Sequence, residues 1–259
     1  MTTERDRYAE RMMNPPAPLD RKRVLTIAFI AFVVVFFLWQ TRSIILYPFY
    51  LLVTYVHEMG HGLAAVFTGG RFVSFHVYPN GAGVAYTDGG NQHLILVAGY
   101  VGTALFGAML LYLANRVRRV TLVSYGMAAF FILSALFFGG SGGWNMITAI
   151  TAFFAIMIGV TAGVGFIALA RYGNRTANVL ILNTFAFIIG FNVINDFLYL
   201  FNNQTIGIDD IPNDAAAMAK LTSTPTASWI ILWLMISILM MGIAAIYAFV
   251  DQKQARVTG

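Results

Sequence analysis

Charged residues and cysteine are scarce in this chain of 259 residues. Only 10% of its residues are charged and 59% are hydrophobic, whereas soluble domains carry about a quarter charged residues. This composition excludes a water-soluble globular protein and indicates a chain that crosses a membrane many times. The absence of cysteine excludes disulfide frameworks and thiolate metal sites.

The formal net charge of +5 does not indicate a nucleic-acid partner. Lys and Arg stand at the ends of apolar runs, where they anchor helices at the lipid headgroups. We therefore expect a lipid bilayer, and no nucleic acid, around this protein. No small-x-small cleavage site follows Trp39, so we expect the first apolar run to be a retained span rather than a cleaved signal.

Apolar segments of roughly the twenty residues that cross about 30 Å of hydrocarbon recur along the chain. They are Val24–Trp39, Ile44–Phe67, His93–Ala114, Val120–Phe138, Trp144–Ala170, Asn178–Phe201 and Ser228–Val250. We predict an all-α polytopic membrane protein with about seven transmembrane helices. A single transmembrane domain (24–251) is expected between a polar N-terminal tail (1–23) and a C-terminal tail (252–259).

Two connecting segments differ from ordinary loops. Arg71–Thr87 consists of two β-rich runs joined by Pro79-Asn80-Gly81, which predicts a β-hairpin (71–87) after the second helix. It is too apolar for a solvated loop, so we expect it to lie at the membrane. The second segment, 202–227, is an acidic loop, and an Ala-rich part of it is expected to form a short helix.

The second apolar segment contains the HExxH pattern His57-Glu58-Met59-Gly60-His61. Residues i and i+4 share one face of a helix, so both imidazoles can reach one ion while Glu58 stands beside it. A charged carboxylate in a membrane helix costs about 2.5–3.5 kcal/mol on insertion scales, and a bound cation would offset this cost. We therefore predict a zinc ion held by His57 and His61. The competing interpretation is polar packing between helices beside a protonated Glu58.

A catalytic zinc ion usually has three protein ligands, so a third donor is required. Of the 11 Asp and Glu residues, only Glu58 and Asp196 lie within predicted spans. The second and sixth segments cross in the same direction, and a rise of 1.5 Å per residue places the HExxH pattern and Asp196 roughly 10–15 Å from the same surface. Asp196 is the expected third ligand, with His76 and His93 as alternatives.

Small and polar residues flank this candidate site. Asn192 lies one helical turn before Asp196 and on the same face. It is a candidate substrate-binding residue that donates to a substrate carbonyl or to the developing oxyanion; the alternative is an interhelical hydrogen bond. Gly99, Thr103 and Gly107 form a small-residue stripe that lets helices approach closely, and we expect it to be structural.

Together these features resemble the site-2 protease family of intramembrane zinc metalloproteases, in particular its small bacterial branch without a PDZ domain. The resemblance rests on the HExxH in a span, the apolar hairpin, the Gly-rich next span and the late-span Asp. It implies His57, His61 and Asp196 as zinc ligands, and Glu58 as the catalytic base of a zinc metalloendopeptidase. Many members place the Asp in an Asn-x-x-Pro and Leu-Asp-Gly context, and this chain lacks that Pro and that Gly.

The resemblance implies cleavage of a peptide bond in or near a transmembrane segment of a membrane protein substrate. An extended substrate could add to the edge of the hairpin, with Phe75 and Tyr78 as expected substrate-binding residues. Alternatively, the hairpin only closes the site. Two other functions share the same metal site: a non-proteolytic transporter or partner-binding regulator, and a zinc hydrolase acting on a lipid or a small amide.

The orientation in the membrane is not fixed by charge. Seven spans would place the N-terminus and the hairpin on the same side, and Lys and Arg then divide equally between the two sides. The cluster Arg21-Lys22-Arg23 favours a cytoplasmic N-terminus, which would put the site near the cytoplasmic side of a bacterial cell membrane. A second cluster, Arg116, Arg118 and Arg119, favours the opposite orientation.

Overall fold

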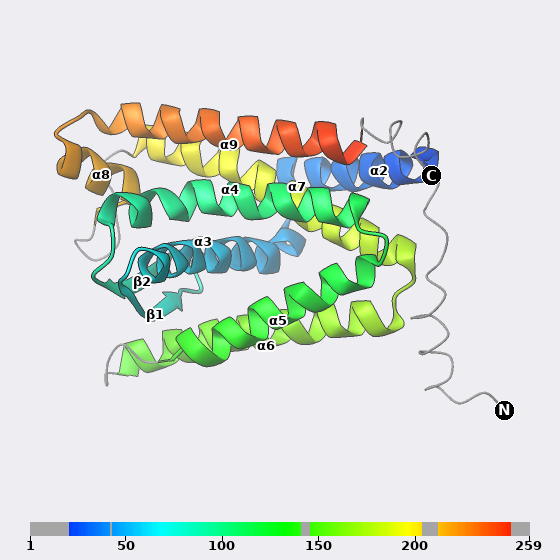
Figure 1. The fold of residues 1–259 in the computed structure, drawn as a ribbon, viewed down its shortest axis with the longest axis horizontal. Coiled ribbons are helices and arrows are strands. Elements are labelled where there is room, and N and C mark those ends of the chain that lie inside the picture. The colour runs from blue at the N-terminus through cyan, green and yellow to red at the C-terminus, as the bar shows by residue number, and fades with distance from the viewer. Residues whose placement is uncertain (1–20, 42, 141–145, 204–211, 250–259) are drawn as a thin grey trace.

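Long helices carry most of the chain in the computed structural model, which describes residues 21–41, 43–140, 146–203 and 212–249 (Figure 1). They are α2 (Arg21–Gln40), α3 (Tyr47–Phe67), α4 (Gln92–Arg116), α5 (Val120–Phe138), α6 (Met146–Tyr172), α7 (Arg175–Asn202) and α9 (Thr226–Phe249). Shorter elements are the 3-10 turn Ile44–Leu46, strands β1 (Arg71–Val77) and β2 (Gly83–Asp88), and helix α8 (Asp214–Thr222). The expected start of the fifth segment, Trp144, lies outside the described residues.

Six of the described helices are long and apolar enough to cross a membrane. The other long helix, α3, carries the polar residues His57, Glu58 and His61 in its C-terminal half. Large apolar side chains such as Phe137 and Leu239 are exposed on the outside of the bundle, where lipid is as apolar as they are. The predicted class, an all-α polytopic membrane protein with a β-hairpin after the second helix, is confirmed.

Helix α3 lies in the middle of the bundle, between α4 on one side and the α5–α6 pair on the other (Figure 1). It packs against α4, α6 and α7 and against both strands of the hairpin, while α9 packs on the far side of α4. Protein therefore surrounds much of α3. This position allows polar side chains on α3 to face other protein groups rather than lipid.

The first helix takes a direction that the sequence did not predict. The rings of Phe32 and Phe187 are 5.9 Å apart, and those of Trp39 and Phe191 are 5.7 Å apart, so α2 runs alongside α7 in the same direction. Helix α3 then continues in that direction, and the hairpin lies at the opposite end of the bundle from the start of α2 (Figure 1). The expectation that the N-terminus shares a side with the hairpin depended on antiparallel first and second helices.

Aromatic packing and interhelical hydrogen bonds fix α3 against α5. Tyr55 and Phe131 are both 0% exposed, and their ring centroids are 5.4 Å apart. The hydroxyl oxygen of Tyr55 lies 2.8 Å from that of Ser134. Polar groups between spans satisfy one another in this way because lipid offers them no partner.

The hairpin forms where the sequence predicts it. Strands β1 and β2 are antiparallel, with His76 opposite Val84 and Arg71 opposite Asp88. Arg71 and Asp88 form an ion pair at the open end. Gly81 has a φ of +88° in the turn, a backbone conformation that residues other than Gly rarely adopt.

Contacts to two helices hold the hairpin in place. Thr54 of α3 donates to the carbonyl oxygen of Gly81 at 2.7 Å. On the other side, Nδ1 of His76 lies 2.9 Å from Oγ1 of Thr151 of α6. The hairpin is thus held between α3 and α6. Its strand β2 lines the cavity described below.

Candidate metal centre

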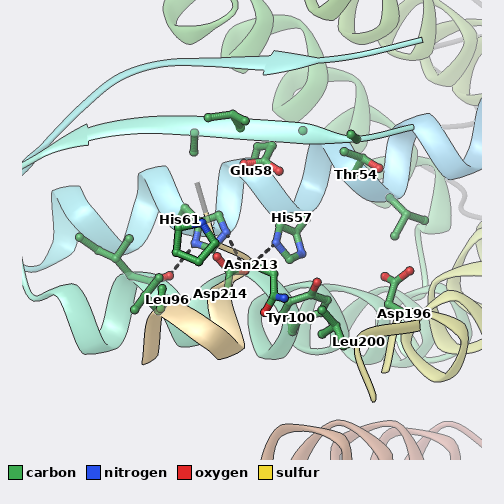
Figure 2. A pocket seen from close by; sticks show the side chains of 18 of the residues that line it. Thr54, His57, Glu58, His61, Leu96, Tyr100, Asp196, Leu200, Asn213 and Asp214 are labelled. Carbon is green, nitrogen blue, oxygen red and sulfur yellow. Dashed lines mark hydrogen bonds and ion pairs between the residues drawn. The ribbon is translucent and has the colours of Figure 1, made fainter. Parts of the chain in front are cut away.

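Three side chains converge at one point between α3, α4 and α8 (Figure 2). His57 and His61 lie one turn apart on α3, and Asp214 is the first residue of α8. Oδ2 of Asp214 lies 3.1 Å from Nε2 of His57 and 3.2 Å from Nε2 of His61. Within the described ranges, these two histidines and one aspartate form a group whose ligand atoms all lie within 4.8 Å of one another.

Asp214 reaches the imidazoles because α8 begins beside them. The side chain of Asn213 caps this helix by accepting a hydrogen bond from the backbone N–H of Ala216 at 3.0 Å. Ala215 and Met218 are buried, and α8 packs against α4 and α9. The third donor is therefore held by a short helix that docks on the bundle, rather than by one of the long helices.

The spacing of the donor atoms fits a zinc ion. Zinc–nitrogen and zinc–oxygen bonds of about 2.0–2.2 Å in a tetrahedral site place ligand atoms about 3.3 Å apart. The observed separations of 3.1 and 3.2 Å are close to this value. Two imidazoles and one carboxylate also leave a fourth position for a reacting group, as catalytic zinc sites require.

Neighbouring backbone groups orient the imidazoles and make room between them. Nδ1 of His61 lies 2.7 Å from the carbonyl oxygen of Ile95, so Nδ1–H donates there and the ring is oriented with Nε2 toward the cluster. Gly99 of α4 leaves space at the centre. A Cβ atom at that position would lie 2.5 Å from Nε2 of His57 and 2.6 Å from Nε2 of His61.

The charge of Asp214 is set by the two imidazoles. Burial raises the pKa of this carboxyl group, but the charge of His61 and the hydrogen bonds from His57 and His61 outweigh burial. The pKa of Asp214 therefore lies well below its ordinary value, and the group is an anion at neutral pH. A negatively charged oxygen donor beside two imidazole nitrogens suits a divalent cation.

Glu58 lies beside this cluster and under the hairpin (Figure 2). It is 4% exposed, and β2 approaches it so closely that a Cβ on Gly83 would lie 2.5 Å from Oε1 of Glu58. His57, Glu58 and His61 line a cavity of about 940 Å³. Its walls include residues of β2 and one face of α7. The Glu58 carboxyl group, the candidate metal ligands and the inner strand therefore face one space.

Asp196 lines the same cavity, but it does not join the cluster. It lies on α7, apart from the imidazoles and Asp214 (Figure 2). Its Oδ2 accepts a hydrogen bond from Nδ2 of Asn192 at 2.6 Å, so the predicted proximity of these two residues on one face is observed. The structure places Asp214 where the sequence argument placed Asp196, because a connecting helix folds back onto the cluster.

The other predicted site residues lie outside the cavity. Phe75 is 0% exposed, and its ring packs 4.7 Å from that of Tyr55; it faces the core, so the structure gives it a packing role instead of substrate contact. Tyr78 is next to the hairpin turn and does not line the cavity. His76 faces α6 and His93 is exposed on the first turn of α4, so neither alternative ligand reaches the cluster.

Fold and site together define a class of protein: a multi-pass membrane protein with a histidine–carboxylate metal-site candidate and a second carboxylate beside it. The sequence model of the Peptidase M50B-like family matches residues 27–244, which is most of the chain. The protein therefore belongs to the Peptidase M50B-like family, and the resemblance to the site-2 proteases is confirmed. No curated protein and no solved structure matches the chain.

Proposed function

We propose that this protein is an intramembrane zinc metalloprotease that cleaves a peptide bond in or near a transmembrane segment of a membrane protein substrate. The observation that carries this proposal is the convergence of His57, His61 and Asp214 beside Glu58 in one cavity. A metal site that serves only stability needs no free carboxylate next to it. Membership of a peptidase family supports hydrolysis of a peptide bond as the reaction.

Each residue of the centre has a distinct role in this proposal. His57, His61 and Asp214 hold the ion. Zinc bound there would act as a Lewis acid that lowers the pKa of water to about 7 and polarises the scissile carbonyl. Glu58 takes the proton of the attacking water and passes it to the nitrogen of the leaving amine. Strand β2 covers Glu58 and restricts the water that reaches it.

Strand β2 supplies a place for an extended substrate. A helical substrate hides its carbonyl groups in its own hydrogen bonds, so it must unwind before attack. Among the described strands, β2 pairs only with β1, and Gly83, Val84 and Ala85 line the cavity. The substrate adds to β2 as a further strand, which directs its main chain along the metal centre.

The distribution of basic residues indicates how the centre faces the membrane. Most described Lys and Arg residues lie at helix ends remote from the hairpin (Figure 1): Lys22, Arg23, Arg116, Arg118, Arg119, Arg171 and Arg175. At the end that carries the centre, the described basic residues are Arg71, which is paired with Asp88, and Lys220. Because Lys and Arg are enriched on the cytoplasmic side, we place the centre near the non-cytoplasmic side of a bacterial cell membrane. This replaces the cytoplasmic placement expected from the sequence alone.

Replacement of Glu58 by Gln tests the proposed reaction. The purified Glu58→Gln protein should retain zinc at the wild-type stoichiometry, measured by mass spectrometry of the metal. Its cleavage of a reconstituted transmembrane substrate should fall by about 10²–10⁴-fold, the range of general acid–base catalysis. A Glu58→Gln protein with full biological function and bound zinc would instead favour a non-proteolytic transporter or regulator.

A further inference from the structure

The carboxylate of Asp196 faces the cavity without a basic partner. Among the described residues, the ion pairs join Asp214 to His57 and His61, and Arg71 to Asp88. Asp196 accepts one hydrogen bond, from Asn192 at 2.6 Å. A carboxylate within a membrane segment is costly unless it is paired, and such residues mark binding sites by default. Among the described residues, Asp196 therefore has no basic side chain to offset the cost of its position in a membrane helix.

The place of Asp196 on α7 makes it accessible to a ligand in the cavity. Asn192, Asp196, Tyr199 and Leu200 all line the cavity of the metal centre, and their spacing puts them on one face of the helix. Asn192 donates to Oδ2, which leaves Oδ1 of Asp196 available to accept a hydrogen bond from a ligand. The α7 face thus presents one carboxyl group between polar and apolar neighbours.

A second cavity extends this space away from the metal centre. It has a volume of about 630 Å³ and shares Tyr50 and Asn192 with the first cavity. Figure 2 shows Asp196 to one side of the cluster formed by His57, His61 and Asp214. A substrate whose scissile bond lies at that cluster would therefore bring a neighbouring residue, rather than the scissile bond itself, to Asp196.

We propose that Asp196, oriented by Asn192, is a specificity-determining residue that binds a lysine or arginine side chain of the substrate close to the scissile bond. This inference rests on the proposed protease function. A basic side chain suits the site because its charged end can pair with Asp196, while its alkyl stem packs along the apolar part of Tyr50 and Leu200. The substrate side chain would also give Asp196 the basic partner that it lacks in the protein alone.

Matched peptides test this subsite. N-acetylated transmembrane peptides of one sequence carry either lysine or norleucine at a single position, moved residue by residue across one helical turn on each side of the cleavage site. The acetyl group removes the α-ammonium, so lysine is the only new cation. At one of these positions, lysine should raise kcat/KM of the wild-type protein by roughly 10–100-fold, as a charge-assisted hydrogen bond predicts.

Three variants show whether Asp196 causes the preference. Asp196→Asn should remove the difference between the lysine and norleucine peptides while its zinc content stays at the wild-type level. Asp196→Lys should favour a glutamate peptide at the same position. The double variant Asp196→Asn/Asn195→Asp keeps the net charge but moves the carboxylate by one residue, so it should not restore the preference for lysine.

The outcomes separate this inference from the proposed function. An unchanged lysine preference in Asp196→Asn, a restored preference in the double variant, or loss of zinc from Asp196→Asn would each overturn the subsite. If the wild-type protein cleaves no peptide, the same pairs can be bound to the Glu58→Gln protein. The absence of cleavage would contradict the protease function. Tighter binding of the lysine peptide to Glu58→Gln, if it disappears in Glu58→Gln/Asp196→Asn, would still support the subsite.

Discussion

Nε2 of His57 lies 3.1 Å from Oδ2 of Asp214, although 157 positions separate the two residues in the chain. One comes from a helix in the middle of the bundle and the other from a short helix outside the long apolar ones. The metal centre is therefore complete only when α8 is docked against α4 and α9. Its assembly depends on packing at the end of the bundle as well as on the HExxH pattern.

Replacement of Gly99 by Ala should damage the metal centre without touching a ligand. The added Cβ would lie 2.5 Å from Nε2 of His57 and 2.6 Å from Nε2 of His61, which is closer than Cβ contacts in proteins. We expect zinc affinity to fall by about 10–100-fold, as it does when the support of a metal ligand is disturbed. The matched control is Gly102→Ala on the same helix, where the nearest atoms lie 3.9 Å away. Equal zinc affinity in both variants would contradict this geometry.

Replacement of Phe75 by Ala should lower stability rather than substrate affinity. The side chain is 0% exposed and packs against Tyr55, so its loss leaves a cavity between the hairpin and α3. Such truncations cost about 3–5 kcal/mol. Thermal unfolding in detergent measures this, with Phe67→Ala, at a residue 82% exposed, as the control. A Phe75→Ala protein of normal stability with a raised KM would instead support a role in substrate binding.

The hairpin should become less stable in acid because of His76. Burial lowers the pKa of this residue below its ordinary value, so the folded protein favours the neutral imidazole. The unfolded chain takes up a proton as the pH falls through about 6.5, and the unfolded state then binds more protons than the folded one. The stabilisation is thus present above about pH 6.5 and is lost as the pH falls from there toward the lowered pKa.

The variant His76→Gln removes this titration while keeping a polar group opposite Thr151. Unfolding temperatures of both proteins, measured from about pH 8 down to about pH 5, give the comparison. The wild-type protein should lose stability more steeply than the variant below about pH 6.5. His57 and His61 are present in both proteins, so their effects cancel. Parallel curves would show that His76 does not contribute to acid sensitivity.

The proposed orientation can be tested by cysteine labelling, for which this chain is suited because it has no native cysteine. A single cysteine at Lys220, near the metal centre, should react in intact cells with a reagent that does not cross the membrane. A single cysteine at Arg119, at the opposite end, should react only after the cells are opened. The reverse pattern would return the centre to the cytoplasmic side.

Local periodicity was sufficient to predict much of the fold and two of the three donors of the candidate metal centre. The apolar runs form helices in the part of the chain that the structure describes, and the turn at Pro79-Asn80-Gly81 gives a hairpin with the expected strands. His57 and His61 share one helix face because their spacing of four residues requires it. These features depend on residues close together in the sequence, where helix and turn geometry leaves few alternatives.

The third donor depends on tertiary packing and could not be predicted in the same way. The sequence predicts a short Ala-rich helix between Pro212 and Pro225, and α8 is present there. Its docking onto α4 and α9 brings Asp214 to the imidazoles, and no local pattern encodes that contact. The pair Asn213-Asp214 was an available signal, because it combines a helix cap with an acid in the first turn.

Two further features were missed because they depend on contacts between helices. Gly99 belongs to the small-residue stripe that the sequence assigns to packing, and Gly107 of that stripe does pack against Ile189 of α7. Gly99 also adjoins both imidazoles, which spacing alone does not show. The parallel run of α2 beside α7 is likewise set by aromatic contacts such as Phe32 with Phe187, and alternating spans would not predict it.

The central claim is that His57, His61 and Asp214 hold the ion while Asp196 does not. The most direct measurement is the zinc affinity of Asp214→Asn and of Asp196→Asn, two identical chemical changes at two residues of the same cavity. We predict that Asp214→Asn loses affinity by at least about tenfold to a hundredfold, and that Asp196→Asn binds zinc like the wild-type protein. Full binding by Asp214→Asn together with loss in Asp196→Asn would contradict this account and make Asp196 the ligand.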